Sequence, residues 1–413
     1  MRWIVAILLA SSAVLPACSR AVPQANKEFS FDQSSAEIRY EGVNSSGEFI
    51  ESSFIKDPMR NSYQVSAWAA SKKSQVTTLK SVTSVNRINL VFVGDGYTAS
   101  QIPVYVSDVD RSIASILKQE PFKSYASYFA FHRVDVVSSE SGVSRANGGK
   151  IKTALEMTFG CSGLPRLLCA NLNKVSAEAG NAPAVDVVFA LANSDEYGGA
   201  GYLKPAVATY AARNPSSLEL ALHEFGHSFA GLGDEYDTQG VVSNCTSFAN
   251  VAKETRAQMQ SAKAKWYRWL DVQNVSAFPG SCYSSKYYRP TFASKMRVLG
   301  NAYEEVNIEK FILKIYEKVK PIESFMPVGR YAAGVFWISP MKPAGRPLDI
   351  TWTLNGKPLD QFKGQSQIDV RTLLLTSNSN KLAVTVIDNT SAVRDEAARK
   401  KLMTQTVTWT VTR

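Results

Sequence analysis

The sequence predicts an α/β domain in the middle of the chain, with a β-rich module on each side of it. The apolar run 88–93 stops at a Gly-Asp-Gly turn and leads into a helical pattern, which is typical of a buried strand that feeds a helix. Two further apolar runs, at 129–137 and 185–192, have the length and composition of buried strands. Outside residues 86–322 the apolar residues recur with a period of two, which is typical of half-buried strands.

The two flanking segments share this period but differ in their predicted architecture. From 18 to 85, short alternating runs are separated by Ser, Asn, Asp and Pro, which predicts a small N-terminal β-rich module. From 323 to 413, several short strands predict a C-terminal Ig-like β-sandwich. One of these runs, 348–354, ends in the hairpin signal Asn355-Gly356.

The first residues have the pattern of an export signal, which we assign to 1–17. Arg2 precedes an apolar run that is too short to cross a bilayer and that ends in small residues. Cys18 then completes a pattern similar to a bacterial lipobox. We therefore expect an exported lipoprotein, periplasmic or anchored in the outer membrane through Cys18. Release to the extracellular space, after cleavage behind Ala17 or Ala21, is the alternative.

The five cysteines of the chain agree with export. An exported protein seldom keeps an odd thiol, and four cysteines remain if Cys18 carries the lipid. Of the three possible connectivities we prefer the local pairs, Cys161 with Cys169 and Cys245 with Cys282. Zinc binding by these four is the competing interpretation, but no CxxC pair supports it.

Composition and charge restrict the class of partner. The 413 residues are 45% apolar and 20% charged, which is typical of a folded protein. The net charge of +10 could attract an anionic partner. However, the lysines and arginines are scattered and no nucleic-acid-binding motif accompanies them, so we expect no nucleic acid as a partner.

A helix is predicted to carry the chemistry of the chain. It should begin at Ser216, because Glu219 completes a capping-box pattern, and it should run to Gly231. The apolar residues at 218, 222, 225 and 229 fall on one stripe, which we expect to be the buried face.

Two histidines of this helix predict a metal site. His223 and His227 are four residues apart, so their imidazoles lie one above the other and can reach a single cation. Glu224, next to them, can accept a proton from water and pass it to a leaving amine. With only 3 histidines in the chain, chance is a poor explanation for this HExxH arrangement. The pattern therefore predicts a hydrolytic Zn²⁺ site.

A catalytic zinc site needs a third protein ligand, for which we choose Asp234. The glycines that follow His227 let the chain turn sharply, so that a residue just beyond them can return to the metal. Glu235 is the first alternative, and Glu254, on a probable second helix, is a more distant one. His132 lies far upstream in a predicted strand, where we expect a core or surface residue.

The segment 223–236, HEFGHSFAGLGDEY, resembles the active-site signature of the bacterial IgA peptidase-type zinc metallopeptidases. Three other parts of the chain agree with that family: NLVFVGDGYT at 89–98, RVDV and SESG within 133–142, and RPT and SKMR within 289–297. Together they cover the central domain and little outside it.

The resemblance implies a zincin or metzincin-like catalytic domain that acts on a protein or peptide. Met296 would then occupy the turn beneath the zinc. Two features depart from the general metzincin pattern: the glycine after the second histidine comes one residue later, and an acidic residue replaces the third histidine. The third ligand therefore stays open between Asp234 and Glu235. Tyr236 and Tyr288 could each lend a hydroxyl to the oxyanion of the tetrahedral intermediate.

Two functions follow from these patterns. The first is an exported zinc endopeptidase in which Glu224 is the general base for the attack of water on a peptide carbonyl. The alternative is a cell-surface binding protein whose β modules grip a glycan or protein, while the zinc domain is an inactive scaffold.

Overall fold

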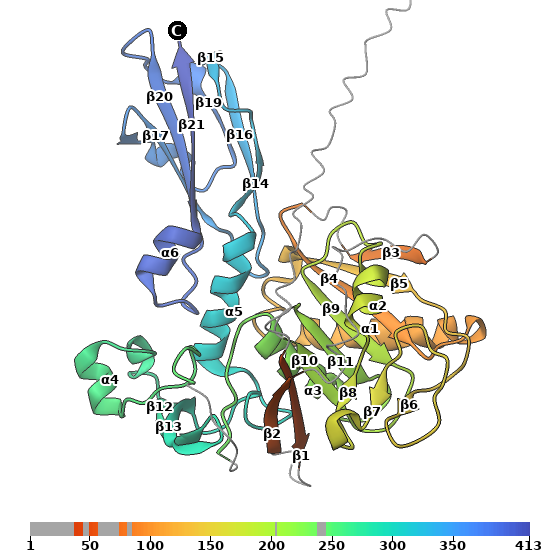
Figure 1. Cartoon of the computed structure of the whole chain (residues 1–413). Coiled ribbons are helices and arrows are strands. Elements are labelled where there is room, and N and C mark those ends of the chain that lie inside the picture. The colour runs from red at the N-terminus through yellow and green to blue at the C-terminus, as the bar shows by residue number, and fades with distance from the viewer. Residues whose placement is uncertain (1–36, 44–48, 57–73, 81–84, 203–204, 238–244) are drawn as a thin grey trace, which may run out of the picture.

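The computed structural model describes residues 37–43, 49–56, 74–80, 85–202, 205–237 and 245–413. The predicted signal over 1–17 and the predicted lipid site at Cys18 lie outside the described residues. The described residues form a mixed α/β body and an elongated β lobe that extends from it toward the C-terminus (Figure 1). The mixed α/β class that the sequence predicts is confirmed.

An eight-stranded sheet runs through the body in the order β2-β1-β10-β11-β9-β4-β5-β3. Strands β11, β9, β4 and β5 are parallel, and β10 runs antiparallel to β11. Strands β4, β9 and β11 are buried along their whole length, which explains why their sequences are almost entirely apolar. The strands of this sheet are β1 (Glu37–Val43), β2 (Phe49–Lys56), β3 (Gln75–Lys80), β4 (Ile88–Asp95), β5 (Phe129–Asp135), β9 (Val187–Ala192), β10 (Gly199–Tyr202) and β11 (Val207–Ala211).

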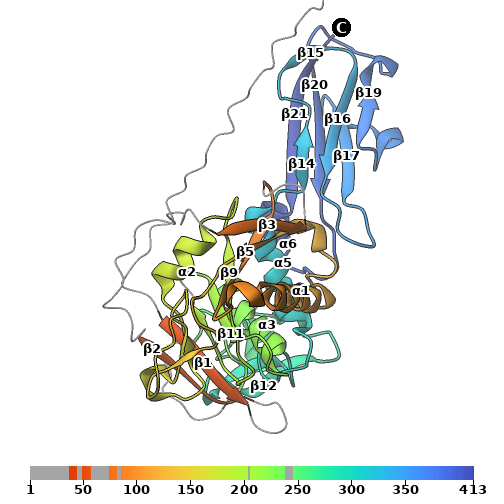
Figure 2. The same cartoon turned by 90° about the vertical axis from the view of Figure 1, so that its right-hand side faces the viewer.

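Alternate residues of the central strands face two different layers of the body. Leu90 and Phe92 of β4 belong to the core that includes helices α1, α3 and α5, whereas Val91 and Val93 belong to the core that includes α2. Figure 2 shows α2 on one side of the sheet and α1 on the other. The elements of the two layers are α1 (Ile102–Lys118), α3 (Ser217–Ser228) and α5 (Glu304–Lys318) on one side, and α2 (Leu172–Ala179), β6 (Ser144–Arg145), β7 (Thr158–Phe159) and β8 (Leu168–Cys169) on the other. Within the described part of the chain, no helix is long and apolar enough to cross a membrane.

The strands nearest the N-terminus do not form a module of their own. Strand β1 pairs antiparallel with β10, and β2 pairs with β1, so both extend the central sheet beyond β10. Strand β3 pairs with β5 at the opposite edge. For the described residues, the prediction of a separate β-rich module over 18–85 is therefore corrected. The period of two in this segment reflects strands that pair with the two edges of the central sheet.

The C-terminal lobe consists of two sheets that face each other, in the orders β14-β16-β19 and β15-β21-β20-β17-β18. Trp409 lies between Phe336 and Trp352, with ring centroids 5.5 and 5.9 Å away, so aromatic side chains join the two sheets. The predicted hairpin is confirmed, because Asn355 and Gly356 have φ of 52° and 80° between two paired strands. The lobe comprises β14 (Ile322–Phe325), β15 (Arg330–Ala332), β16 (Val335–Pro340), β17 (Asp349–Leu354), β18 (Lys357–Pro358), β19 (Gln367–Asp369), β20 (Asn380–Ile387), α6 (Glu396–Leu402) and β21 (Thr404–Thr412). An Ig-like topology stays a prediction.

A buried carboxylate joins the two lobes. Asp388, at the end of β20, accepts hydrogen bonds of 2.7 Å from the hydroxyls of Tyr125 and Tyr316, which belong to the body. Arg346 of the C-terminal lobe donates to the same carboxylate at 2.9 Å. Since Asp388 is fully buried, this network fixes one lobe on the other.

Candidate metal centre

Helix α3 carries the predicted histidines and spans Ser217–Ser228, close to the predicted range. Its start differs from the prediction in one detail, because Ser216 makes no side-chain capping bond. Glu219 instead forms an ion pair with the buried Lys295 and accepts a hydrogen bond from the backbone N–H of Gly300. The capping box is therefore replaced by contacts that tie the first turn of the helix to the loop around Lys295.

The two histidines are buried side by side with their Nε2 atoms 2.8 Å apart. The Nδ1 of His223 lies 2.9 Å from the carbonyl oxygen of Lys295, and the Nδ1 of His227 lies 2.8 Å from that of Leu232. A carbonyl oxygen can only accept, so each Nδ1 carries the proton. This leaves Nε2 as the ring nitrogen of each histidine that can present a lone pair to a metal, as in metal-binding histidines.

Asp234 completes the group of side chains that can hold a cation. The chain leaves α3, turns at Gly231 with φ of 62°, and returns so that Asp234 Oδ1 lies 3.3 Å from His223 Nε2 and 3.0 Å from His227 Nε2. Three donor atoms at these separations can share one ion with bonds of about 2.0–2.2 Å. All three side chains are buried.

The two alternative ligands lie in other environments. The carboxylate of Glu235 accepts hydrogen bonds from Asn250, Asn307 and Ser294 at 2.8–2.9 Å. Burial raises the pKa of Glu235, although these three hydrogen bonds act in the opposite direction. Glu254 is partly exposed and precedes helix α4 (Arg256–Ala262). Of the three acidic candidates, only Asp234 belongs to the group around the histidines.

Met296, which the family resemblance predicts in the turn beneath the zinc, packs against Gly226 of α3. It is fully buried, and its sulfur would lie 2.6 Å from a Cβ added to Gly226, so a larger residue at this point would require the Met296 side chain to shift. The carbonyl oxygen of Met296 accepts a hydrogen bond of 2.9 Å from the backbone N–H of Glu235. The Met296 segment thus contacts both the helix and the chain next to Asp234.

Glu224 lies against the strand next to the helix. A Cβ added to Gly201 of β10 would lie 2.2 Å from Glu224 Oε2. Both carboxylate oxygens of Glu224 are shielded from solvent. The absence of a side chain at Gly201 therefore leaves the room that the Glu224 carboxylate occupies.

Substitution of Gly201 by Ala is expected to displace the Glu224 carboxylate and to lower kcat for peptide hydrolysis roughly 10-fold, since a misplacement of about 1 Å can cost up to ~100-fold. Steady-state kinetics on a peptide substrate would measure this effect. The matched control is Gly149→Ala, because nothing lies within 4 Å of a Cβ at Gly149. Equal kcat values for the two variants would contradict the inference that Gly201 leaves room for the Glu224 carboxylate.

The predicted tyrosines have different positions. Tyr236 is buried next to the site, with its hydroxyl 3.2 Å from that of Tyr283. Tyr288 instead packs in a separate cluster with Met259 and Trp266, so the structure does not bring it to the histidines. Tyr283 donates a hydrogen bond to Asp234 Oδ2, a contact that the sequence does not predict. Nothing in the pattern around a lone tyrosine signals such a contact.

The remaining predicted residues have structural positions. His132 is buried in β5, within 3.0 Å of Asn89 and 3.1 Å of Thr78, as expected of a core histidine. The two predicted disulfides, Cys161–Cys169 and Cys245–Cys282, are both present.

The segment 89–98, which the family resemblance also includes, positions a loop and does not contribute to the metal group. Asp95 is buried at the end of β4 and accepts hydrogen bonds of 2.7–2.8 Å from the backbone of Leu155 and Met157 and from the hydroxyl of Thr153. Burial raises the pKa of this carboxyl, while the hydrogen bonds lower it. The carboxylate holds the long connection between β5 and β7 in place.

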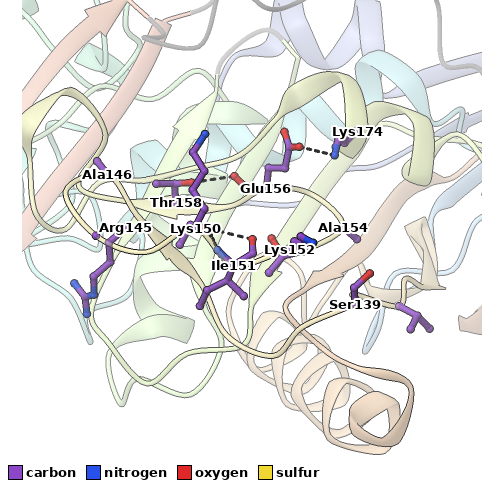
Figure 3. A pocket seen from close by; sticks show the side chains of 14 residues that line it. Ser139, Arg145, Ala146, Lys150, Ile151, Lys152, Ala154, Glu156, Thr158 and Lys174 are labelled. Carbon is purple, nitrogen blue, oxygen red and sulfur yellow. Dashed lines mark hydrogen bonds and ion pairs between the residues drawn. The ribbon is translucent and has the colours of Figure 1, made fainter.

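This connection forms a pocket of about 560 Å³ that is distinct from the metal group (Figure 3). Lys174 and Glu156 form an ion pair of 2.7 Å in its wall, and Arg145, Lys150 and Lys152 also line it. None of the predicted site residues contributes to this pocket. The candidate metal site is therefore defined here by its donor atoms.

Comparison with known proteins agrees with this arrangement. The model of the IgA Peptidase M64 family matches residues 76–318, which include every member of the metal group and Glu224. No curated protein matches the chain. Since the match covers more than half of the 413 residues, this chain belongs to the IgA Peptidase M64 family and is a metallopeptidase.

Proposed function

We propose that the chain is a zinc-dependent endopeptidase whose metal is held by His223, His227 and Asp234. One observation carries this proposal: two imidazole lone pairs and a carboxylate oxygen converge within 2.8–3.3 Å in a fully buried place. Buried charges are generally paired or coordinate a metal, and three ligand atoms this close together suit a single cation. Two histidines, one carboxylate and a hydrogen-bonded outer shell are a donor set that suits zinc.

A zinc ion at this place supplies a Lewis acid that polarises the peptide carbonyl and acidifies water. The protein supplies the proton transfers. Glu224 accepts the proton of the attacking water and then delivers it to the nitrogen of the leaving amine. The backbone carbonyls of Lys295 and Leu232 keep both imidazoles in the required tautomer throughout.

The alternative of an inactive binding protein has no support. The family match is to peptidases, and the ligands and the base that the proposed reaction needs are all present in the chain.

Removal of the metal tests the proposal directly. Dialysis of the purified protein against a zinc chelator is expected to abolish hydrolysis of a peptide library, and one equivalent of Zn²⁺ should restore it, because Glu224 alone cannot polarise the carbonyl. Cleavage is followed by mass spectrometry and zinc by elemental analysis. Full activity of the zinc-free protein would exclude the proposed reaction.

We also propose that the protein is exported and held at a membrane by a lipid on Cys18. The basis is the sequence pattern over 1–18 together with the two disulfides, which are typical of an oxidising compartment. We further propose that the catalytic domain spans 86–322 and that the β-sandwich spans 323–413.

A further inference from the structure

The turn between β12 (Val275–Ser281) and β13 (Ser284–Thr291) has an unusual backbone. Cys282 and Tyr283 both have positive φ, 49° and 61°, although neither is glycine. Residues other than glycine rarely adopt this conformation and keep it only when their surroundings fix it. Two adjacent ones mark a turn that the surrounding structure holds in place.

Three hydrogen bonds fix this turn against the segment that carries Asp234. The backbone N–H of Cys282 and the hydroxyl of Ser281 both donate to the carbonyl oxygen of Asp234, at 3.0 and 2.9 Å. The backbone N–H of Tyr283 donates to the carbonyl oxygen of Tyr236 at 3.0 Å. The disulfide to Cys245 adds a covalent link.

A buried arginine supports the same turn from behind. Arg289 of β13 donates to the backbone carbonyls of Pro279 and Gly280, just before the turn. It belongs to the RPT segment that the family resemblance singled out and that has no part in the chemistry. Burial lowers the pKa of Arg289 to about 10, which is still well above neutrality. The guanidinium therefore stays charged and keeps its hydrogen bonds to both carbonyl oxygens.

The turn places the Tyr283 hydroxyl on one oxygen of the third ligand. Tyr283 is 4% exposed, and its hydroxyl donates to Asp234 Oδ2, while Asp234 Oδ1 faces both histidines. The hydrogen bond therefore assigns the two carboxylate oxygens to different partners. The Tyr283 hydroxyl donates to Oδ2, whereas Oδ1 lies next to the Nε2 atoms of the two histidines.

We infer that Tyr283 is a positioning residue for the metal, and that the Cys245–Cys282 disulfide holds it in place. This inference rests on the proposed function, because it assumes that Asp234 is a zinc ligand. Partners of this kind orient a ligand before the metal arrives, and their loss typically weakens metal binding about 10- to 100-fold. Zinc affinity should therefore depend on a residue that does not touch the metal and on the redox state of one disulfide.

Substitution of Tyr283 by Phe in the full-length protein tests the first part. Zinc binding, measured by competition with a chromophoric chelator, should weaken about 10- to 100-fold. The visible spectrum of the Co²⁺-loaded protein should change as well, since the carboxylate is free to rotate. The matched control is Tyr105→Phe, which removes an equally buried hydroxyl that donates to the carbonyls of Phe92 and Val134, away from the metal.

The disulfide is tested with a second pair of variants. Joint replacement of Cys245 and Cys282 by Ser should weaken zinc binding in the same direction, because the turn that carries Tyr283 then loses its covalent link and is held by hydrogen bonds alone. Joint replacement of Cys161 and Cys169 removes the other disulfide, which lies on the far layer of the sheet, and should leave zinc affinity unchanged. Circular dichroism of the zinc-free proteins checks that each variant is folded.

The outcomes separate the two proposals. If the wild-type protein binds no zinc, the proposed function fails and the role of Tyr283 fails with it. If the wild-type protein binds zinc and a folded Tyr283→Phe variant binds it equally well with an unchanged Co²⁺ spectrum, only the role of Tyr283 is overturned. Equal weakening by both cysteine pairs would show a general loss of stability and would overturn the role of the disulfide.

Discussion

Replacement of Glu224 by Gln is expected to lower kcat for peptide hydrolysis by about 100- to 10,000-fold, the range that a positioned general base contributes. Gln keeps the size of the side chain and its place against Gly201, but its amide cannot accept a proton from water. Zinc content should stay near that of the wild-type protein, because Glu224 is not a member of the metal group. Steady-state kinetics and elemental analysis on the same preparation measure both quantities.

Glu317→Gln is a suitable control for this variant. Glu317 is an exposed residue of α5 that pairs with Lys314, so the substitution makes the same chemical change far from the reaction. Its kcat should equal that of the wild-type protein. A Glu224→Gln variant that holds zinc and retains full activity would rule out Glu224 as the base.

Replacement of Asp234 by Ala is expected to weaken zinc binding by more than about 100-fold, since even the loss of an outer partner costs roughly 10- to 100-fold. Two imidazoles remain, but the negative charge that offsets the cation is gone. Activity at limiting zinc should fall with the metal content. Chelator competition measures the affinity, and a titration with excess Zn²⁺ shows how much activity returns.

The neighbouring Glu235 provides the comparison that decides between the two acidic candidates. Glu235→Gln should retain one zinc per chain, because the side chain contacts Asn250, Asn307 and Ser294 and not the histidines. Loss of zinc from Glu235→Gln together with its retention in Asp234→Ala would exchange the roles of the two residues.

The sequence was informative about the site because the site is largely local. His223, Glu224, His227 and Asp234 lie within twelve positions, so helix geometry and one glycine turn suffice to bring them together. Tyr283 lies 49 positions from Asp234 and reaches it through a turn with positive φ at two residues other than glycine. No periodicity or composition rule predicts such a contact.

The N-terminal strands show a second limit of sequence patterns. A period of two predicts that a segment is a strand, but it does not say which strand lies next to it. Strands β1 and β3 join opposite edges of the same sheet, through backbone pairing with β10 and β5. Similarly, the period-two pattern of the last hundred residues gave no sign of helix α6, which begins at Glu396, behind the capping side chain of Asp395.

The stabilising effect of Asp388 at the junction of the two lobes depends on pH. Burial alone would raise the pKa of Asp388, but the hydrogen bonds from Arg346, Tyr125 and Tyr316 outweigh it and lower the pKa below its ordinary value. A carboxyl whose pKa is lower in the folded state stabilises that state at every pH above its unfolded value of about 3.9, and loses this effect only as the pH falls through the folded value. The contribution of Asp388 to the contact between the two lobes is therefore complete in neutral and mildly acidic surroundings and is lost only in strong acid.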